Sequence, residues 1–214
     1  MNRDESNSNL LQSDEMLVSD SADVYLLFAS LFGCTTYKYD LFTQDQPDII
    51  WISRQLIFLN RSADIIKKYN GVIVKTIDNR ISGDNGIFVY FEAATNPFDI
   101  LNCGIEIIQS FDNLKTYKGK SKIEANISID FGETYNGTIS KSIPFDPIGL
   151  PVERCTWLNF MTGRDQIIFS DEFLKILATK KPLEEIRQKY GITSKEAEPK
   201  GLGNVIFHTI DAKK

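Results

Sequence analysis

The chain has 214 residues, 42% of them hydrophobic, which is enough for one domain with a substantial core. Its formal net charge of −5 argues against general binding to nucleic acid or to anionic membranes, because such binding requires clustered Lys and Arg. Its three cysteines are widely spaced, which indicates neither a zinc site nor a disulfide framework. No apolar segment reaches transmembrane length and the N-terminal residues lack a signal-peptide pattern, so we expect a soluble, cytoplasmic protein.

The first part of the sequence predicts a tail, a strand, a helix and a hairpin. Residues 1–23 are polar and acidic, which is typical of a flexible tail. Residues 24–30, VYLLFAS, form a continuous apolar run that predicts a buried strand. After a polar link, residues 49–69 have the length of a helix with two lysines in its last turn. Residues 71–77 and 86–91 then predict two strands, joined by a turn at Gly-Asp-Asn-Gly.

The middle of the sequence predicts a second helix and a second hairpin. Residues 96–111 begin with Asn-Pro, a cap and a first-turn proline, and continue with apolar residues at helical spacing. Residues 122–131 alternate between apolar and polar, which predicts a strand with one exposed face. Residues 133–137 are expected to turn the chain into a further strand that ends near Phe145.

The last part of the sequence predicts three helices and two strands. Residues 150–160 favour a short helix, residues 166–169 a buried strand, and Ser170 is expected to cap the helix that follows. A small helix at 182–190 precedes a polar stretch and a closing strand at 204–210. Helices and strands do not alternate strictly along the chain, which indicates an α+β fold with a largely antiparallel sheet.

The strings LLFASLFGCT, NGVIVKTI and DPIG, followed by SDEF and by PKG with VIFHTI, occur in a characteristic order. Their order and spacing resemble the catalytic domain of the class III nucleotidyl cyclases, the family of adenylyl and guanylyl cyclases. The resemblance covers residues 24–211. It implies a ferredoxin-like cyclase-homology domain, in which helices pack on a mainly antiparallel sheet.

The resemblance also implies a chemistry, the conversion of a nucleoside triphosphate to a cyclic monophosphate between two cyclase domains. Two metal ions assist that reaction, and two aspartates hold them. Here Ser30 occupies the first aspartate position, and Asn79 occupies the second when the hairpin is aligned from its Lys-Thr-Ile. Asp78 and Asp84 are alternative carboxylates, but one carboxylate opposite Ser30 makes a poor two-metal site. We therefore expect no metal cofactor, or Mg²⁺ or Mn²⁺ if the domain is active.

The positions that contact the nucleotide in the family are only partly kept. Lys75 and Asp146 match the pair that recognises adenine, although both could equally be solvated charges at strand ends. Glu153 and Trp157 occupy the positions of an asparagine and an arginine that orient the ribose and stabilise the phosphates. Arg154 is expected to point elsewhere, and Trp157 is expected to pack.

The combined pattern predicts a degenerate cyclase-homology domain that is catalytically impaired. Its role would be that of a nucleotide-binding or dimerising regulatory module in cyclic-nucleotide signalling. Its expected partners are a second copy or another cyclase domain, together with a nucleoside triphosphate, but neither nucleic acid nor membrane. Two alternatives remain open: an active divergent cyclase that uses Asp78 or Asp84, and a pure protein-interaction module. The sole histidine, His208, is expected to be structural.

Overall fold

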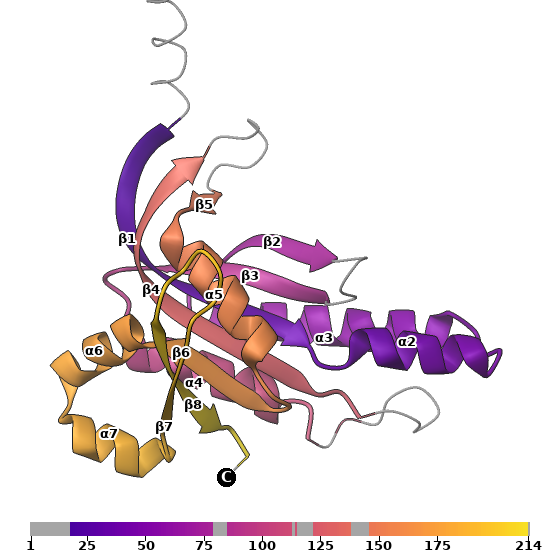
Figure 1. The fold of residues 1–214 in the computed structure, drawn as a ribbon. Helices are drawn as coiled ribbons and strands as arrows, with labels where there is room; N and C mark the ends of the chain where they lie inside the picture. The colour runs from indigo at the N-terminus through magenta and orange to yellow at the C-terminus, as the bar shows by residue number, and fades with distance from the viewer. Residues whose placement is uncertain (1–17, 79–84, 113, 115–121, 138–145, 214) are drawn as a thin grey trace, which may run out of the picture.

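The structure is a computed structural model that describes residues 18–78, 85–112, 114, 122–137 and 146–213 (Figure 1). The strands are β1 (Val18–Leu31), β2 (Val72–Asp78), β3 (Asn85–Glu92), β4 (Ala125–Gly137), β5 (Pro147–Ile148), β6 (Gln166–Ser170), β7 (Thr193–Ala197) and β8 (Val205–Asp211). The helices are α2 (Cys34–Thr43), α3 (Ile49–Lys68), α4 (Pro97–Gln109), α5 (Leu150–Met161), α6 (Asp171–Lys180) and α7 (Leu183–Tyr190).

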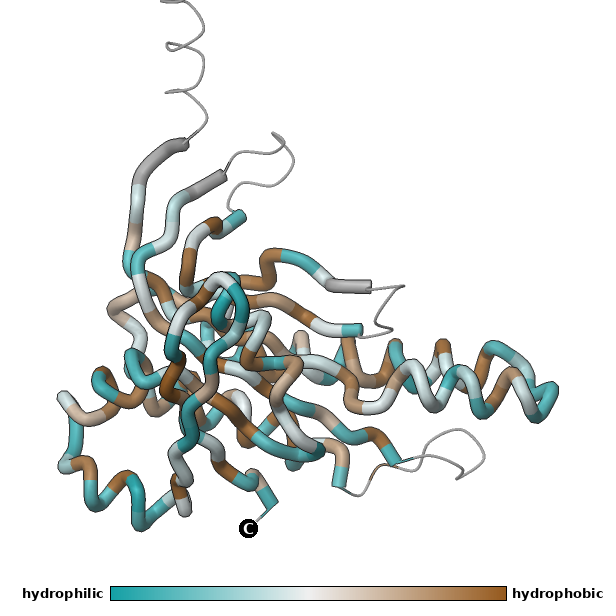
Figure 2. The backbone as a smooth tube through the Cα atoms, in the orientation of Figure 1, coloured by the Kyte–Doolittle hydropathy of each residue, from teal (hydrophilic) through white to brown (hydrophobic). Residues whose placement is uncertain are grey.

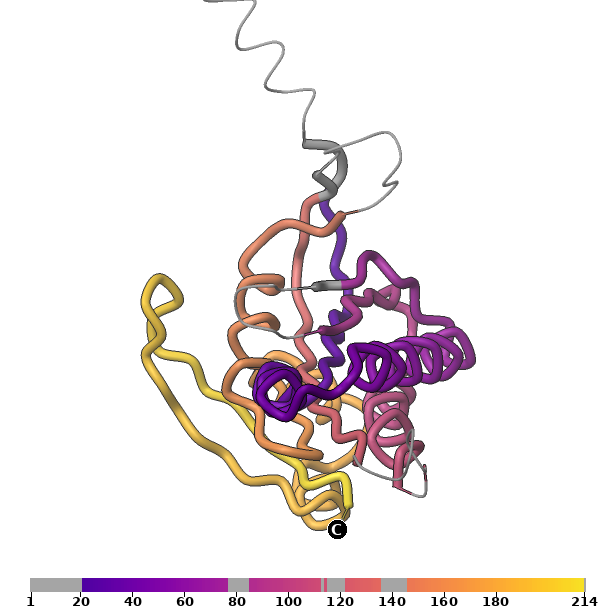
Figure 3. Tube along the Cα trace, turned by 90° about the vertical axis from the view of Figure 1, so that its right-hand side faces the viewer, coloured from indigo at the N-terminus to yellow at the C-terminus, as the bar shows by residue number. Residues whose placement is uncertain are grey.

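The strands form one sheet in the order β2-β3-β1-β4-β6-β8-β7, with the short β5 paired to β4. All described strand pairs are antiparallel except the parallel pair of β4 and β6. β2 and β7 therefore lie at opposite edges, and Figure 3 shows the β7–β8 hairpin on the far side of the molecule from β2. This arrangement confirms the predicted α+β fold with a mainly antiparallel sheet.

Helices cover both faces of the central strands, which explains the uninterrupted apolar run in β1. Tyr25, Leu27 and Ala29 face the main core beneath α3, α4 and α6, whereas Leu26 and Phe28 face a smaller cluster beneath α5. Apolar residues accordingly recur along the central strands in Figure 2. Among the described residues, no helix has both the length and the apolar character needed to cross a membrane.

The polar face of β4 corrects the prediction of a strand exposed on one side. Asn126, Ser128 and Asp130 are all buried, because α5 lies over them. Each polar group finds a partner on that helix; the Ser128 hydroxyl, for example, donates to the backbone oxygen of Cys155 at 2.7 Å. Alternation in a sequence shows that the two faces of a strand differ, but it does not show what covers each face.

Four further predictions about the elements differ from the structure. The turn expected at 133–137 is wrong, because these residues continue β4 and pair with the first part of β1, which begins at Val18 rather than Val24. α2 forms where a polar link was expected, and β7 forms within the polar stretch before the last strand. β7 is an exposed edge strand, so it carries no apolar pattern. Residues 1–17, and the strand expected to end near Phe145, lie outside the described residues.

A buried ion pair joins β4, α5 and α6. Arg154 Nε donates to Asp130 Oδ2 at 2.7 Å and Arg154 Nη2 donates to Asp130 Oδ1 at 2.9 Å. The Ser170 hydroxyl, at the start of α6, and the Phe131 amide also donate to Asp130 Oδ1. The Asp130 side chain is 0% exposed and that of Arg154 is 13% exposed, so removal of Arg154 leaves the Asp130 carboxylate as a charge that water cannot reach.

We therefore expect Arg154→Met to lower the free energy of unfolding by about 3–5 kcal/mol, because it leaves the Asp130 carboxylate buried without its cationic partner. The control is Arg164→Met, which removes the 63% exposed partner of Glu124 and should cost less than about 1 kcal/mol. Urea denaturation followed by circular dichroism measures both. Similar losses in the two variants would contradict a structural role for the buried pair.

Candidate functional site

Ser30, at the end of β1, belongs to a buried network of neutral groups. Its hydroxyl oxygen lies 2.6 Å from Asn126 Oδ1 on β4 and 2.7 Å from Asn159 Oδ1 on α5. A hydroxyl has one hydrogen, so it donates to one of these oxygens at a time. Asn126 Nδ2 donates to the backbone oxygen of Asn159 at 3.2 Å, and Asn159 Nδ2 to that of Phe28 at 2.9 Å, which turns both amide oxygens towards Ser30.

The donors around Ser30 do not fit a site for Mg²⁺ or Mn²⁺. These ions favour carboxylate oxygens, whereas Ser30, Asn126 and Asn159 are neutral and already hydrogen-bonded to one another. Elsewhere in the described part of the chain, no three His, Cys, Asp or Glu residues lie together as a metal site would need. Burial also matters, because a carboxylate in place of Ser30, which is 2% exposed, would need a cation beside it.

The second acidic position lies at the end of the central hairpin. Ser30 pairs with Gly86 on β3, and Gly86 pairs with Ile77 on β2, so the backbone of Asp78 lies one position beyond this row. Gly86 is required here, because a Cβ would lie 2.3 Å from the Phe28 ring and 2.6 Å from the Ala29 backbone oxygen. Asn79 and Asp84 lie outside the described residues, so their place in the site stays a prediction.

A recess of about 270 Å³ lies next to Ser30, between the first turn of α2 and the C-terminal part of α5. Gly33 precedes α2 in a left-handed conformation with φ of 66°, and no side chain caps the helix. The N-terminus of a helix carries a partial positive charge, and its free N–H groups favour an anion. The buried Arg54 adds a full charge nearby, because its Nη2 donates to the Phe32 backbone oxygen at 3.1 Å.

Lys75 and Asp146, which are 71 positions apart in the sequence, form an ion pair with an Nζ–Oδ1 distance of 2.8 Å. Lys75 comes from β2 and Asp146 immediately precedes β5. The Lys75 side chain is 43% exposed and that of Asp146 is 8% exposed, so one end of the pair remains open to solvent. The structure thus brings together the two residues that the resemblance assigns to the base.

The residues of α5 that the resemblance aligns with ribose and phosphate contacts do not supply equivalent groups. Glu153 is exposed. Trp157 packs edge-on against Phe207 of β8, with ring centroids 6.1 Å apart, and it does not line the recess beside Ser30. Arg154 points to Asp130, as described above, and is not free to take over the role of the missing arginine.

Asn126, Asn159 and Arg54 were missed by reasoning from the sequence alone. Asn126 belongs to the polar half of an alternating strand, and Asn159 follows the tryptophan on a helix with weak amphipathicity, so neither pattern marks a site.

His208 is 2% exposed and lies between Ser194 Oγ, 2.9 Å from Nδ1, and Asp171 Oδ1, 3.1 Å from Nε2. Burial lowers its pKa, and Asp171 opposes that shift, as is usual for a structural histidine.

The sequence matches no protein-family model and no curated protein. Solved structures, in contrast, match over most of the chain. The guanylyl cyclase Cya2 has a TM-score of 0.73 and 20% identity, covering 90% of this chain and 93% of its own. The guanylate cyclase domain of RhGC from Catenaria anguillulae, in complex with GTP, has a TM-score of 0.69 and 16% identity over 90% and 98%. The adenylyl cyclase CyaB from P. aeruginosa has a TM-score of 0.67 and 16% identity over 89% and 94%.

These neighbours define the class of the fold. The chain has the fold of a class III nucleotidyl cyclase catalytic domain, as the strings in its sequence predicted. At these identities the likeness concerns the fold alone, so the chemistry must be argued from the residues of the site.

We expect Ser30→Ala to lower the free energy of unfolding by about 1–3 kcal/mol, because two buried amide oxygens lose the hydroxyl donor between them. The matched control is Ser53→Ala on α3, where the hydroxyl donates to the Ile50 backbone oxygen of its own helix at 2.9 Å. That change should be close to neutral, since alanine favours a helix. Chemical denaturation of both variants makes the comparison, and a neutral Ser30→Ala would contradict the network.

Proposed function

We propose that this chain is a degenerate cyclase-homology domain that binds a nucleoside triphosphate without cyclising it. Its role is that of a regulatory partner in cyclic-nucleotide signalling. The observation that carries the proposal is the neutral network around Ser30, the residue that the resemblance aligns with the first metal-binding aspartate. Without that carboxylate, the site lacks the strongest ligand for a catalytic metal ion.

Loss of turnover follows from the charges that a cyclisation requires. Attack of the ribose hydroxyl on the α-phosphate builds negative charge on the phosphate oxygens and on the leaving pyrophosphate, and enzymes stabilise this charge with metal ions and cationic side chains. Trp157 supplies only an indole N–H, and Arg154 is held by Asp130. Contacts that bind the triphosphate equally well before and during reaction do not accelerate it.

Two features support retained nucleotide binding. The uncapped N-terminus of α2 borders the recess beside Ser30 and can accept a phosphate group. Lys75 offers ammonium donors and Asp146 offers carboxylate acceptors, which together complement the edge of a purine base. Among the solved neighbours, the RhGC domain from Catenaria anguillulae holds GTP, and a rhodopsin-guanylyl cyclase core with converted specificity holds ATPαS.

We expect ATP or GTP to bind the purified protein in the presence of EDTA as well as Mg²⁺, because the groups described above bind without a bridging metal. Calorimetry should show weaker binding for Lys75→Ala and unchanged binding for Lys195→Ala, which lies on the opposite edge strand β7. Incubation with Mg²⁺ or Mn²⁺ followed by mass spectrometry should reveal no cyclic product.

A cyclic product that disappears in Asp78→Asn or Asp84→Asn would instead support the active divergent cyclase. Absence of nucleotide binding under every condition would support the pure interaction module. Either result would contradict the proposed function.

Pairing with a second cyclase domain is supported by apolar side chains at both ends of α5. Ile148 and Leu150 are 50% and 54% exposed near its start, and Phe160 and Met161 are 56% and 52% exposed near its end. Large apolar side chains that remain exposed at both ends of one helix favour association with another protein. The occupant we favour is a second copy of this chain or a related cyclase domain.

We expect the wild-type protein to dimerise in sedimentation velocity experiments, and Leu150→Ser with Met161→Ser to shift it towards monomer, because both changes remove apolar contact area. The control is Phe42→Ser near the C-terminal end of α2, where the side chain is 81% exposed and the helix points away from α5 (Figure 1). A wild-type protein that stays monomeric at high concentration would contradict pairing between copies of this chain.

A further inference from the structure

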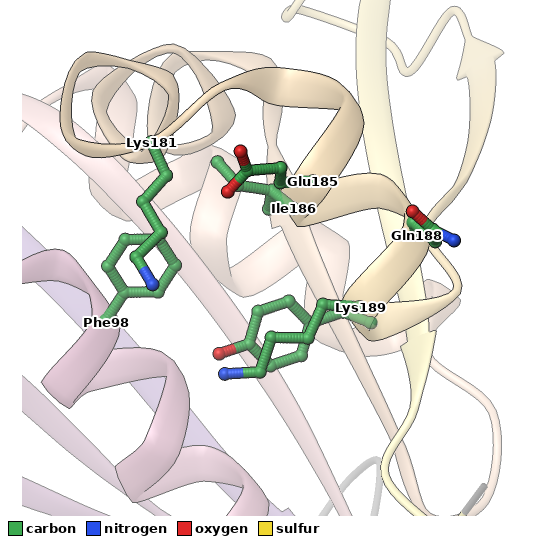
Figure 4. Close-up of a pocket in the computed structure, with 7 residues that line it drawn as sticks. Phe98, Lys181, Glu185, Ile186, Gln188 and Lys189 are labelled. Carbon is green, nitrogen blue, oxygen red and sulfur yellow. The ribbon is translucent and has the colours of Figure 1, made fainter.

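A second recess lies on a different part of the molecule, between the first turn of α4 and helix α7. Its volume is about 300 Å³, and its lining includes Phe98, Lys181, Glu185, Lys189 and Tyr190 (Figure 4). None of these residues lines the recess beside Ser30, and none belongs to the Lys75–Asp146 pair. A ligand here would therefore be additional to the nucleotide of the proposed function.

Two aromatic rings form the part of this recess that is anchored to the core. Phe98 of α4 and Tyr190 of α7 have ring planes 21° apart and centroids separated by 6.4 Å. Both side chains are half-buried and pack against the main core of the domain, so their ring faces are held in place. Nearly parallel, fixed rings offer a surface on which a flat, unsaturated ligand can stack.

Two lysines supply a positive charge directly over these rings. Lys181 Nζ lies 5.6 Å from the centroid of Phe98, and Lys189 Nζ lies 4.7 Å from the centroid of Tyr190. Figure 4 shows the two lysine side chains entering the recess from different sides. Neither lysine forms an ion pair within the described ranges of the chain.

The charge of the recess is thus locally positive on a chain whose formal net charge is −5. Glu185 is the one acidic residue of its lining, against Lys181 and Lys189. An ammonium group over an aromatic face is stabilised by the ring and remains able to donate to a carboxylate or phosphate oxygen. Long lysine side chains can also move aside to uncover the rings.

We propose that this recess binds a small aromatic anion, with its ring on the Phe98–Tyr190 surface and its anionic group on Lys181 and Lys189. A nucleoside monophosphate has this chemistry, since it joins a flat base to a phosphate. Because Phe98 belongs to α4 whereas the other groups belong to α7 and its N-terminal link, such a ligand would join these two segments.

The test uses AMP as the probe, with adenosine and inorganic phosphate as its two halves, in calorimetry on the full chain. We expect AMP to bind with a Kd below about 1 mM, and each half to bind roughly tenfold more weakly, since each makes only part of the contacts. The paired change Lys181→Gln with Lys189→Gln should weaken AMP binding by about tenfold or more. Tyr190→Leu should weaken the binding of AMP more than the binding of phosphate.

Two controls separate this recess from the site beside Ser30. Lys180→Gln, at the exposed end of α6 and outside the lining, should leave AMP binding unchanged. Because AMP carries the purine that the Lys75–Asp146 pair would also contact, the titrations are repeated in the Lys75→Ala background, where Lys181→Gln with Lys189→Gln should weaken AMP binding by the same factor as in the wild-type background. AMP binding that survives Lys181→Gln with Lys189→Gln, or phosphate binding as tight as AMP, would overturn the proposal. No AMP binding at millimolar concentration would overturn it as well.

Discussion

The buried pair of Asp130 and Arg154 fixes helix α5, and the chemistry of the site depends on where α5 lies. Burial raises the pKa of the Asp130 carboxyl, and Arg154 opposes that shift; burial acts to lower the pKa of the Arg154 guanidinium, but Asp130 outweighs this effect, so that pKa is raised. We take the pair as ionised, because two short donations from one guanidinium match a carboxylate. With Arg154 held on β4, the same helix places Asn159 against Ser30 and Trp157 against β8.

The network around Ser30 lets a central strand end in buried polar groups without placing a charge there. β1 is covered on both faces, so a carboxylate at its end would have to be compensated by a cation. Serine with two asparagines fills the same place with hydrogen bonds alone. Under the proposed function, loss of the acid and recruitment of the amides are therefore physically one change, because the strand end remains stable without a metal ion.

Much of the fold could be predicted because it follows from local patterns. The apolar C-terminal half of β1 and the capped, proline-initiated α4 were predicted close to their observed positions, although β1 begins at Val18 rather than Val24. The buried polar face of β4 could not be predicted, because Asn126 and Asp130 are satisfied by α5, a helix that lies later in the sequence. The Lys75–Asp146 contact was predictable only through the family resemblance, since 71 positions separate the two residues.

The net charge of this acidic chain predicts some kinds of binding but not others. A net charge of −5 bears on non-specific binding to a polyanion, where many cations must act together over a wide surface. A small anion samples only the few groups within reach, because charges beyond about 8–10 Å are screened at ordinary ionic strength. The helix terminus beside Ser30 and the lysines over Phe98 and Tyr190 each create a positive region of that size. Affinity for a single phosphate is therefore a local property, and an acidic protein can have it at two separate places.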